Sequence, residues 1–253
     1  MWRAIELDHL LSHELPSGFG IDVGCGDGRL MQVLREHGLD WRLVGLDPDP
    51  AETRLAAQSG QYERVLTCSA AEIPEEDGSF DFAFSNSVLE HIAPISETLA
   101  EIARVLKPRG RLIATVPSAA LNECLAGPGL LSPILGRDGD YLRRFDERVA
   151  HVNLWDEAHW RGELQRVGFG EVAFAPYFSA TEVRRWERFS NWTGGLASAM
   201  SGKRPIEISR RAGVSTDGPL TPLLRPPARA ISRFALRGVG SGRKACLLID
   251  ARI

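Results

Sequence analysis

Short apolar runs alternate with longer segments of helical periodicity through the first half of the chain. Apolar runs of about four to eight residues bounded by turn residues are typical of buried strands, whereas apolar positions recurring roughly every three to four residues indicate helices. The pattern predicts strands at residues 19–23, 42–46, 64–68, 80–84 and 111–116, and helices at residues 28–36, 50–57 and 95–106. Such alternation is typical of a parallel α/β sheet with helices on both faces.

Weaker patterns nearer the two ends of the chain complete the sheet. Residues 3–14 predict a short amphipathic helix that packs as a lid or flank, and residues 156–167 predict another helix with Asp156 as its N-cap. Strand-like runs follow at residues 171–178 and 244–253. The predicted fold is a doubly wound, Rossmann-like α/β sheet of seven strands, mostly parallel, whose last strand is antiparallel.

One domain is the simplest organisation for a chain of 253 residues. Residues 18–116 form its predicted ligand-binding core. Two variable segments, residues 117–155 and 179–242, contain many turn residues, and the second carries helical periodicity at residues 181–192 and 228–237. Because long irregular segments in compact domains are usually functional, we expect these two segments to form a pocket and a helical or irregular cap.

Composition narrows the class of protein. Hydrophobic residues make up 43% of the chain and charged residues 25%, close to the averages of soluble globular proteins. The N-terminus lacks the basic start and apolar block of a signal peptide, and no stretch approaches the roughly 18 apolar residues of a membrane span. The four cysteines are scattered, without the spacing of a zinc site or a disulfide framework. We therefore predict a cytoplasmic protein with reduced thiols.

Charge is unevenly distributed along the chain. Residues 201–244 contain ten Lys or Arg and two acidic residues, a net charge of +8, whereas the rest contains 20 basic and 31 acidic residues, a net charge of −11. Basic residues interleaved with apolar ones are typical of peripheral contact with an anionic membrane surface. They are equally compatible with a cap over an active site or with a solvated insertion.

The stretch "DVGCGDGRL" places Gly24, Gly26 and Gly28 between the first predicted strand and the helix that follows. Ligands of open α/β sheets bind at the carboxyl ends of the strands, near the point where the strand order reverses. Because glycine lacks a Cβ, the backbone there can turn tightly and approach a ligand. The N-terminus of the following helix also favours a negative group, such as a carboxylate.

Two aspartates narrow the identity of this ligand. Asp47 ends the next predicted strand, where a carboxylate can accept hydrogen bonds from both hydroxyls of a ribose. Asp22 precedes the first glycine, and the glycine spacing is G-x-G-x-G rather than the G-x-G-x-x-G of dinucleotide sites. Since a carboxylate would repel a pyrophosphate and attract an ammonium or sulfonium group, the predicted ligand is S-adenosylmethionine rather than a nicotinamide dinucleotide.

Four motifs, in order and at the expected spacing, resemble those of class I S-adenosylmethionine-dependent methyltransferases of the type 11 group. They are "DVGCGDGRL", "VGLDPDP", "AAEIPEEDGSFDFAFSNSVLEHI" and "EIARVLKPRGRLIATVP", all between residues 18 and 116. The resemblance implies that Gly24 and Gly26 approach the cofactor, that Asp22 lies near its methionine part, and that Asp47 binds its ribose.

The resemblance also implies roles for four residues further along the chain. Ala70 and Ala71 match the loop that lines the adenine, and Asn86 lies where the fourth strand leads toward the methyl group and the acceptor. Ser69 stands where many relatives have aspartate, so its hydrogen bond to the adenine is less firmly implied. Arg109 stands where the usual "KPGG" turn has a glycine.

Methyl transfer to a hydroxyl requires alignment of the acceptor and removal of its proton. His151 and His91 are the candidate proton acceptors, because histidine titrates near neutrality. The alternative for His91 is a helix-cap or packing role, and for His151 a loop residue bonded to backbone. His91, His151 and His159 lack compact ligand spacing, so the sequence predicts no metal site.

The predicted acceptor is a small molecule, a glycan or a lipid-linked metabolite, methylated on oxygen. The stretch "FSNSVLEH" lacks the N/D-P-P-Y/F signature that accompanies methylation of planar amines, which disfavours nucleic acid as the acceptor. Three alternatives stay open. One is a regulatory protein that binds S-adenosylmethionine without turnover. The second is a nucleic-acid methyltransferase that contacts its substrate through the basic segment 201–244. The third is a nicotinamide-dependent oxidoreductase, which the glycine spacing and Asp22 disfavour.

Overall fold

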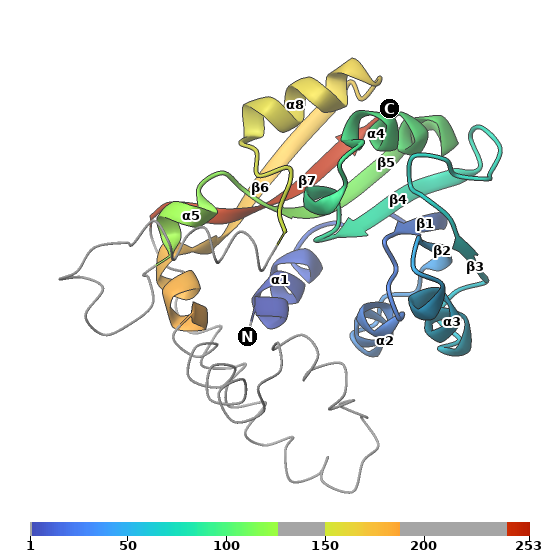
Figure 1. Cartoon of the computed structure of the whole chain (residues 1–253), viewed down its shortest axis with the longest axis horizontal. Helices are drawn as coiled ribbons and strands as arrows, with labels where there is room; N and C mark the ends of the chain where they lie inside the picture. Colours follow the sequence, from blue (N-terminus) through green and yellow to red (C-terminus); the bar gives the residue numbers. More distant parts are fainter. Residues whose placement is uncertain (1, 126–149, 188–241) are drawn as a thin grey trace, which may run out of the picture.

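The computed structural model describes residues 2–125, 150–187 and 242–253 (Figure 1). Its helical elements are α1 (Trp2–Leu11), α2 (Arg29–Glu36), α3 (Pro50–Gln58), the 3₁₀ turn η1 (Leu89–His91), α4 (Ile95–Val105), α5 (Leu121–Cys124) and α8 (Glu157–Arg166). Its strands are β1 (Phe19–Val23), β2 (Arg42–Asp47), β3 (Arg64–Thr67), β4 (Phe80–Asn86), β5 (Leu106–Pro117), β6 (Glu171–Ser179) and β7 (Lys244–Arg252).

The seven strands form one sheet in the order β3-β2-β1-β4-β5-β7-β6. Strands β1 to β5 are parallel, and β7 is antiparallel to both β5 and β6. This confirms the predicted fold, including the antiparallel last strand. The chain moves outward from β1 to β3 and then returns to β4, so the strand order reverses between β1 and β4. Open α/β sheets bind ligands at such a reversal.

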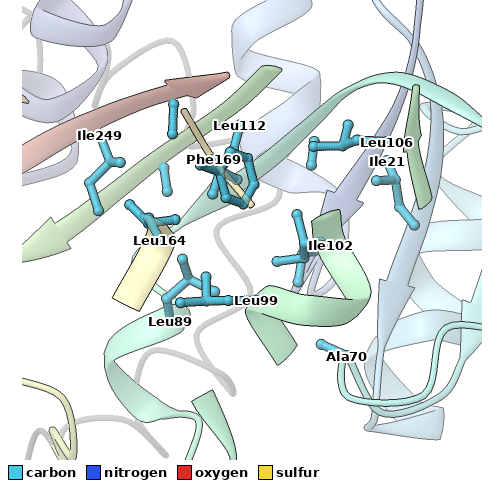
Figure 2. Close-up of a cluster of buried hydrophobic side chains, with 14 of the residues drawn as sticks. Ile21, Ala70, Leu89, Leu99, Ile102, Leu106, Leu112, Leu164, Phe169 and Ile249 are labelled. Atoms are coloured by element: carbon cyan, nitrogen blue, oxygen red, sulfur yellow. The ribbon is translucent and has the colours of Figure 1, made fainter. Parts of the chain in front are cut away.

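The sheet separates two clusters of buried side chains. Figure 1 shows α4 and α8 on one face of the sheet and α1 and α2 on the other. Ile102 of α4 and Leu164 of α8 belong to the cluster drawn in Figure 2, whereas Leu10 of α1 belongs to the opposite cluster. The neighbouring residues Ala83 and Phe84 of β4 point into different clusters. The central strands β1, β2 and β4 are therefore covered on both sides, which explains their almost continuous apolar sequences.

Most element boundaries match the predicted ones within a few residues, and β5 differs most. It begins at Leu106 and includes the "KPRG" segment, which the sequence pattern had placed between helix and strand. Leu106 pairs with Phe80, and the register shifts before Phe82, so the extra residues form an irregularity in the ladder. Arg109 has φ 66°, the left-handed conformation that the usual glycine of this turn would adopt easily.

The one N-cap predicted from the sequence, Asp156, is confirmed. Asp156 caps α8 by accepting a hydrogen bond from the backbone N–H of His159 at 2.8 Å. Gly28, predicted as the first residue of a helix, is instead the N-cap of α2 with φ 79°. Helix α1 ends at Leu11, a few residues before the predicted end.

The predicted variable segments are only partly described. Residues 180–187 are helical, which agrees with the periodicity that begins at residue 181. The helix predicted at residues 228–237, and the basic segment 201–244 apart from its last three residues, lie outside the described residues. Among the helices that the structure describes, none has both the length and the apolar character needed to cross a membrane.

Candidate functional site

The residues predicted to bind the cofactor lie along one edge of the sheet. Strands β1 to β4 are parallel neighbours, so the turns that follow them meet at their carboxyl ends. These turns and strand ends carry all eight predicted cofactor-binding residues: Asp22, Gly24, Gly26, Asp47, Ser69, Ala70, Ala71 and Asn86. The fold therefore brings together positions that are up to 64 residues apart in the sequence.

The glycine turn after β1 is held against β2 and leaves one open position. The N–H groups of Gly24 and Cys25 both donate to the carbonyl of Leu46, at 2.8 and 2.9 Å. A Cβ at Gly24 would lie 2.5 Å from the side chain of Val88, so the protein itself fills that space. A Cβ at Gly26 would meet no heavy atom within 4 Å. Of the three glycines in this turn, Gly26 alone presents its backbone to open space, where a ligand can approach.

The Asp47 carboxylate borders this open position and is oriented by the backbone. Its Oδ2 accepts a hydrogen bond from the N–H of Gly26 at 3.1 Å, and its Oδ1 accepts one from the N–H of Asp49 at 2.9 Å. A carboxylate has about four acceptor sites, so each oxygen keeps one for a ribose hydroxyl. The open backbone at Gly26 and the half-used carboxylate beside it fit the nucleoside part of S-adenosylmethionine.

Asp22 is a buried carboxylate on β1, with 5% of its surface exposed. Its Oδ2 accepts a hydrogen bond from the hydroxyl of Tyr62 at 2.7 Å. The pKa of Asp22 is raised to about 7, mainly by burial; the hydrogen bond from Tyr62 opposes the shift, and the charge of Asp47 adds to it. A positively charged group of a ligand would restore the ionised form. Sequence reasoning missed Tyr62, which lies before β3, 40 positions from Asp22.

The loop after β3 places three small side chains beside Asp47. Thr67, the last residue of β3, is the register partner of Asp47, so residues 69–71 begin next to the end of β2. The hydroxyl of Ser69 accepts a hydrogen bond from the N–H of Ala71 at 3.2 Å, and Ala70 is 8% exposed. Their small size is compatible with the predicted contact to the adenine.

Asn86, at the end of β4, is buried in a polar network. Its amide Nδ2 donates to the hydroxyl of Thr115 at 2.5 Å, and its Oδ1 accepts from the guanidinium of Arg3. The Glu6 carboxylate, 1% exposed, also binds this guanidinium and accepts from Thr115 at 3.0 Å and Tyr177 at 3.1 Å. Helix α1 is thereby bound to three strands near the candidate site.

Sequence reasoning missed Arg3 and Glu6 as parts of this network. Glu6 lies four positions before Leu10, a spacing that puts both side chains on one face of a helix. A carboxylate on the buried face of an amphipathic helix was the available signal, because buried carboxylates need hydrogen-bond donors.

Both candidate proton acceptors lie in one group with Glu90, which we name the imidazole–carboxylate cluster (Glu90, His91 and His151). One ligand atom from each residue lies within 4.8 Å of the other two. The rings of His91 and His151 have centroids 5.2 Å apart. The pKa of Glu90 is raised to about 8, mainly by burial; a backbone hydrogen bond opposes the shift, the charge of Glu6 adds to it, and the charge of Arg3 opposes it.

The segment that carries His151 is bonded to η1. The backbone carbonyl of Glu90 accepts from the N–H groups of Val152 and Asn153, at 2.7 and 3.0 Å. The side-chain amide of Asn153, itself buried, donates to the carbonyls of Leu89 at 2.8 Å and Ile92 at 2.7 Å. These four bonds hold His151 beside Glu90 although the two residues are 61 positions apart. Asn153 is a further residue that sequence reasoning missed.

A separate hollow of about 470 Å³ opens near the carboxyl end of β5. It is lined by residues of the loop after β5, the start of α8 and strands β6 and β7, including Ser118, Asp156 and Lys244. None of the predicted site residues is among its lining residues. The candidate cofactor site is therefore defined by the strand-end turns rather than by this hollow.

Comparison with known proteins agrees with this geometry. Residues 21–114 match a family described as "Methyltransferase domain". An uncharacterized methyltransferase of Mycolicibacterium gilvum is 35% identical over 190 residues, which cover 73% of this chain and 65% of the relative. An uncharacterized methyltransferase of Mycobacterium tuberculosis is 34% identical over 123 residues, 49% of each chain.

A relative with a stated activity is the malonyl-[acyl-carrier protein] O-methyltransferase of Serratia marcescens, 30% identical over 104 residues, 41% of this chain and 40% of the relative. This chain thus spans less than two thirds of the length of each of these relatives. A solved structure from Thermotoga maritima, described as a methyltransferase and possible histamine N-methyltransferase, is similar in fold. Its TM-score is 0.58 at 20% identity, covering 99% of this chain and 88% of the other.

The matching domain, the relative that aligns with 73% of the chain and the order of the seven strands have one explanation in common. The chain belongs to the class I S-adenosylmethionine-dependent methyltransferases.

Proposed function

We propose that this protein transfers the methyl group of S-adenosylmethionine to a hydroxyl oxygen of a small-molecule, glycan or lipid-linked acceptor. The observation that carries the proposal is the open backbone at Gly26 beside the partly used carboxylate of Asp47. When bound, the cofactor supplies a methyl group on a sulfonium, whose leaving group is a neutral thioether. The protein therefore has to bind the cofactor and the acceptor, align the acceptor oxygen with the methyl group, and remove one proton from the acceptor.

Each cofactor-binding residue has a proposed task. Asp47 holds both ribose hydroxyls through the acceptor sites that the backbone leaves unused. Asp22 faces the positively charged methionine part, because a buried carboxylate gains most from a nearby cation. Ser69, Ala70 and Ala71 contact the adenine.

Asn86 has its proposed task at the acceptor side. The network around it fixes its amide, so that the end of β4 is rigid where the methyl group and the acceptor would meet. A fixed geometry favours transfer, because alignment of the reacting atoms supplies much of the rate enhancement of such reactions.

The proton of the acceptor hydroxyl leaves at the imidazole–carboxylate cluster. His151 is the first candidate and His91 the second, since both are within reach of the same small volume. Oxygen as the methylated atom is supported by the activity stated for the Serratia marcescens relative, an O-methyltransferase. In this proposal the segments 117–155 and 179–242 form the acceptor pocket. The proposed location is the cytoplasm, with peripheral membrane contact through residues 201–244.

Calorimetric titration tests the cofactor first. We expect micromolar binding of S-adenosylmethionine and S-adenosylhomocysteine and no binding of NAD. Asp47→Ala should weaken the binding free energy of both adenosyl ligands by about 1.5 to 3 kcal/mol, the scale of hydrogen bonds to a charged group. Asp49→Ala is the matched control, because Asp49 caps α3 with its side chain. NAD binding without binding of either adenosyl ligand would contradict the proposal.

Turnover is tested next, by release of S-adenosylhomocysteine in the presence of alcohols, phenols and sugars. A substrate among these would support O-methylation, and His151→Ala should then lower turnover while leaving the affinity for S-adenosylhomocysteine nearly unchanged. Normal turnover of His151→Ala would remove this residue as the proton acceptor. Cofactor binding with no turnover for any acceptor class would favour the regulatory alternative.

A further inference from the structure

The imidazole–carboxylate cluster has a composition that recurs in metal sites with open positions. Two imidazoles and one carboxylate hold catalytic zinc, and the same set forms the facial triad of non-haem iron proteins. The distance between Oε1 of Glu90 and Nε2 of His91 is 3.8 Å, and all three ligand atoms lie within 4.8 Å of one another. Donor atoms around a tetrahedral zinc ion lie roughly 3.3 Å apart, given bonds of about 2.0 to 2.1 Å. Side-chain shifts of about 1 Å would bring the three donor atoms to this spacing.

The carboxylate of Glu90 lacks the partners that a buried charge needs. Its residue is 1% exposed, and among the described residues its Oε2 has no hydrogen-bond partner. Arg3 is close enough to act on it electrostatically, but Arg3 already forms an ion pair with Glu6 at 2.5 Å. A buried carboxylate is stable only when it is paired, protonated or bound to a metal.

The ring of His91 is fixed in the form that binds metals. Its Nδ1 lies 3.0 Å from the carbonyl oxygen of Ala150. Since a carbonyl can only accept a hydrogen bond, Nδ1 carries the proton, and in the neutral ring Nε2 keeps its lone pair. That nitrogen faces Oε1 of Glu90. Metal-binding histidines usually donate their other ring N–H to a carbonyl or carboxylate in this way.

The geometry is preformed by main-chain contacts. The hydrogen bonds from Val152 and Asn153 to the carbonyl of Glu90 fix His151 next to the carboxylate before any ion is present. Val88, two residues before Glu90, fills the space over Gly24. The cluster therefore lies one short turn from the glycine loop that is proposed to bind the cofactor.

We infer that Glu90, His91 and His151 form a binding site for one divalent transition-metal ion of the zinc type, with open positions toward the acceptor. Binding of the ion does not depend on the proposed function; its role does. A metal ion lowers the pKa of a hydroxyl that it coordinates. With the ion present, the imidazoles serve as ligands, the acceptor hydroxyl releases its proton to solvent, and its oxygen becomes the nucleophile.

The inference revises the expectation drawn from the sequence, in which the histidines lacked compact spacing. His91 and His151 are 60 positions apart, and only the folded chain brings them together with Glu90. The sequence signal of a metal site is ligand spacing along one element, and this cluster has its ligands on two segments.

Titration of the untagged, cofactor-free protein with Co²⁺ tests the site, because cobalt bound by nitrogen and oxygen ligands absorbs visible light. We expect saturation at one equivalent and displacement of the absorbing ion by Zn²⁺. Glu90→Gln and His91→Ala should weaken Co²⁺ binding by roughly tenfold or more, a loss at least as large as that on removing an outer partner of a ligand. His91 has 41% of its side chain exposed, so His91→Ala should fold normally.

His159→Ala is the matched control, because His159 is exposed on α8 and stacks on Trp155 at 4.1 Å. It should bind Co²⁺ as the wild type does. Absence of saturable binding to the wild type, or equal affinities of His91→Ala and His159→Ala, would overturn the inference. Calorimetry with S-adenosylhomocysteine separates the two proposals: loss of cofactor binding alone would contradict the proposed function and leave the metal site in place.

Discussion

Asp22 and Asp47 are carboxylates of neighbouring strands with opposite environments. Asp47 is partly exposed and accepts two backbone N–H bonds, which suits an ionised carboxylate that can also accept hydrogen bonds from ribose hydroxyls. Asp22 is buried with one hydroxyl donor, and its pKa is raised to about 7. The two residues therefore differ in what a ligand must bring: hydrogen-bond donors for Asp47 and positive charge for Asp22.

The raised pKa of Asp22 predicts a pH dependence of cofactor affinity. A positively charged ligand group favours the ionised carboxylate, so binding lowers the pKa of Asp22 and releases a proton. The affinity for S-adenosylhomocysteine should therefore be highest above pH 7 and fall about tenfold between pH 8 and pH 6. Titration calorimetry across this range measures it, with Asp22→Asn as the control. An unchanged pH profile in Asp22→Asn would assign the effect to another group.

The same shift has the opposite sign for the stability of the ligand-free protein. An acid whose pKa is about 7 when folded and 3.8 when unfolded stabilises the fold while protonated, and that contribution is lost as the pH rises through 7. Asp22→Asn keeps the size of the side chain and an acceptor for the hydroxyl of Tyr62. It should therefore raise the Tm at pH 8 and weaken the binding of the cofactor. A lower Tm at pH 8 would indicate a structural role for the charge.

Gly26 offers a test of the open backbone that carries the proposed function. Gly26→Ala should cost about 1 to 2 kcal/mol of stability, because φ is 53°, and should weaken S-adenosylhomocysteine at least tenfold, since a methyl group would occupy the open space. Gly60→Ala is matched: φ is 69°, its Cβ also meets no atom within 4 Å, and it precedes β3 at the other edge of the sheet. Equal ligand affinities of the two variants would contradict the proposed site.

At the scale of elements, α1 is attached to the sheet by charge as well as by apolar packing. The Oε1 of Glu6 accepts from Ser87 at 2.9 Å, Thr115 at 3.0 Å and Tyr177 at 3.1 Å, which belong to the β4 turn, β5 and β6. One carboxylate thus accepts from three hydroxyls, of which those of Thr115 and Tyr177 are buried and need an acceptor inside the protein.

Removal of this carboxylate should therefore be costly. Glu6→Ala leaves the three hydroxyls without their acceptor and should lower the free energy of unfolding by about 3 to 5 kcal/mol, as measured by urea denaturation. Asp8→Ala, an exposed position on the same helix, should change it by about 0.5 kcal/mol or less. Similar losses in both variants would show that helix propensity, rather than the network, determines the stability of α1.

At the scale of the whole molecule, the elements that position the site could be predicted from the sequence. Apolar runs identified β1, β2 and β4, and the residues that end them form the candidate cofactor site, since parallel strands share one carboxyl edge. The glycine spacing and the order of the motifs favoured S-adenosylmethionine over a nicotinamide dinucleotide as the ligand. The local hydrophobic pattern and the position within a motif were sufficient to predict where these residues lie.

Contacts between distant segments could not be predicted in this way. Tyr62 reaches Asp22 from a turn, and Asn153 reaches η1 from a loop without periodicity. Their partners lie 40 and about 60 positions away, and a single side-chain hydrogen bond leaves no repeating signal in the sequence. The imidazole–carboxylate cluster depends on the contact made by Asn153, so its ligand set appears only in the folded chain.

The connection between β6 and β7 allows a test of the proposed acceptor cap. Ser179 and Lys244 are register partners, and the N–H of Ala180 donates to the carbonyl of Arg243 at 3.1 Å, so the chain leaves and re-enters the sheet at one place. The helical residues 180–187 add about 12 Å. A flexible Gly/Ser linker of about ten residues, with a typical reach of roughly 17 Å, can therefore replace residues 188–241.

We expect this replacement to leave the far-ultraviolet circular dichroism of the sheet and the affinity for S-adenosylhomocysteine unchanged, because β6 and β7 pair directly and the proposed cofactor-binding residues lie at β1 to β4. Turnover of the acceptor should be lost, because the proposed pocket would lack one wall. Calorimetry and product release on the same preparation measure both. Full turnover would exclude residues 188–241 from the acceptor pocket, whereas loss of cofactor binding in a folded protein would place them at the cofactor instead.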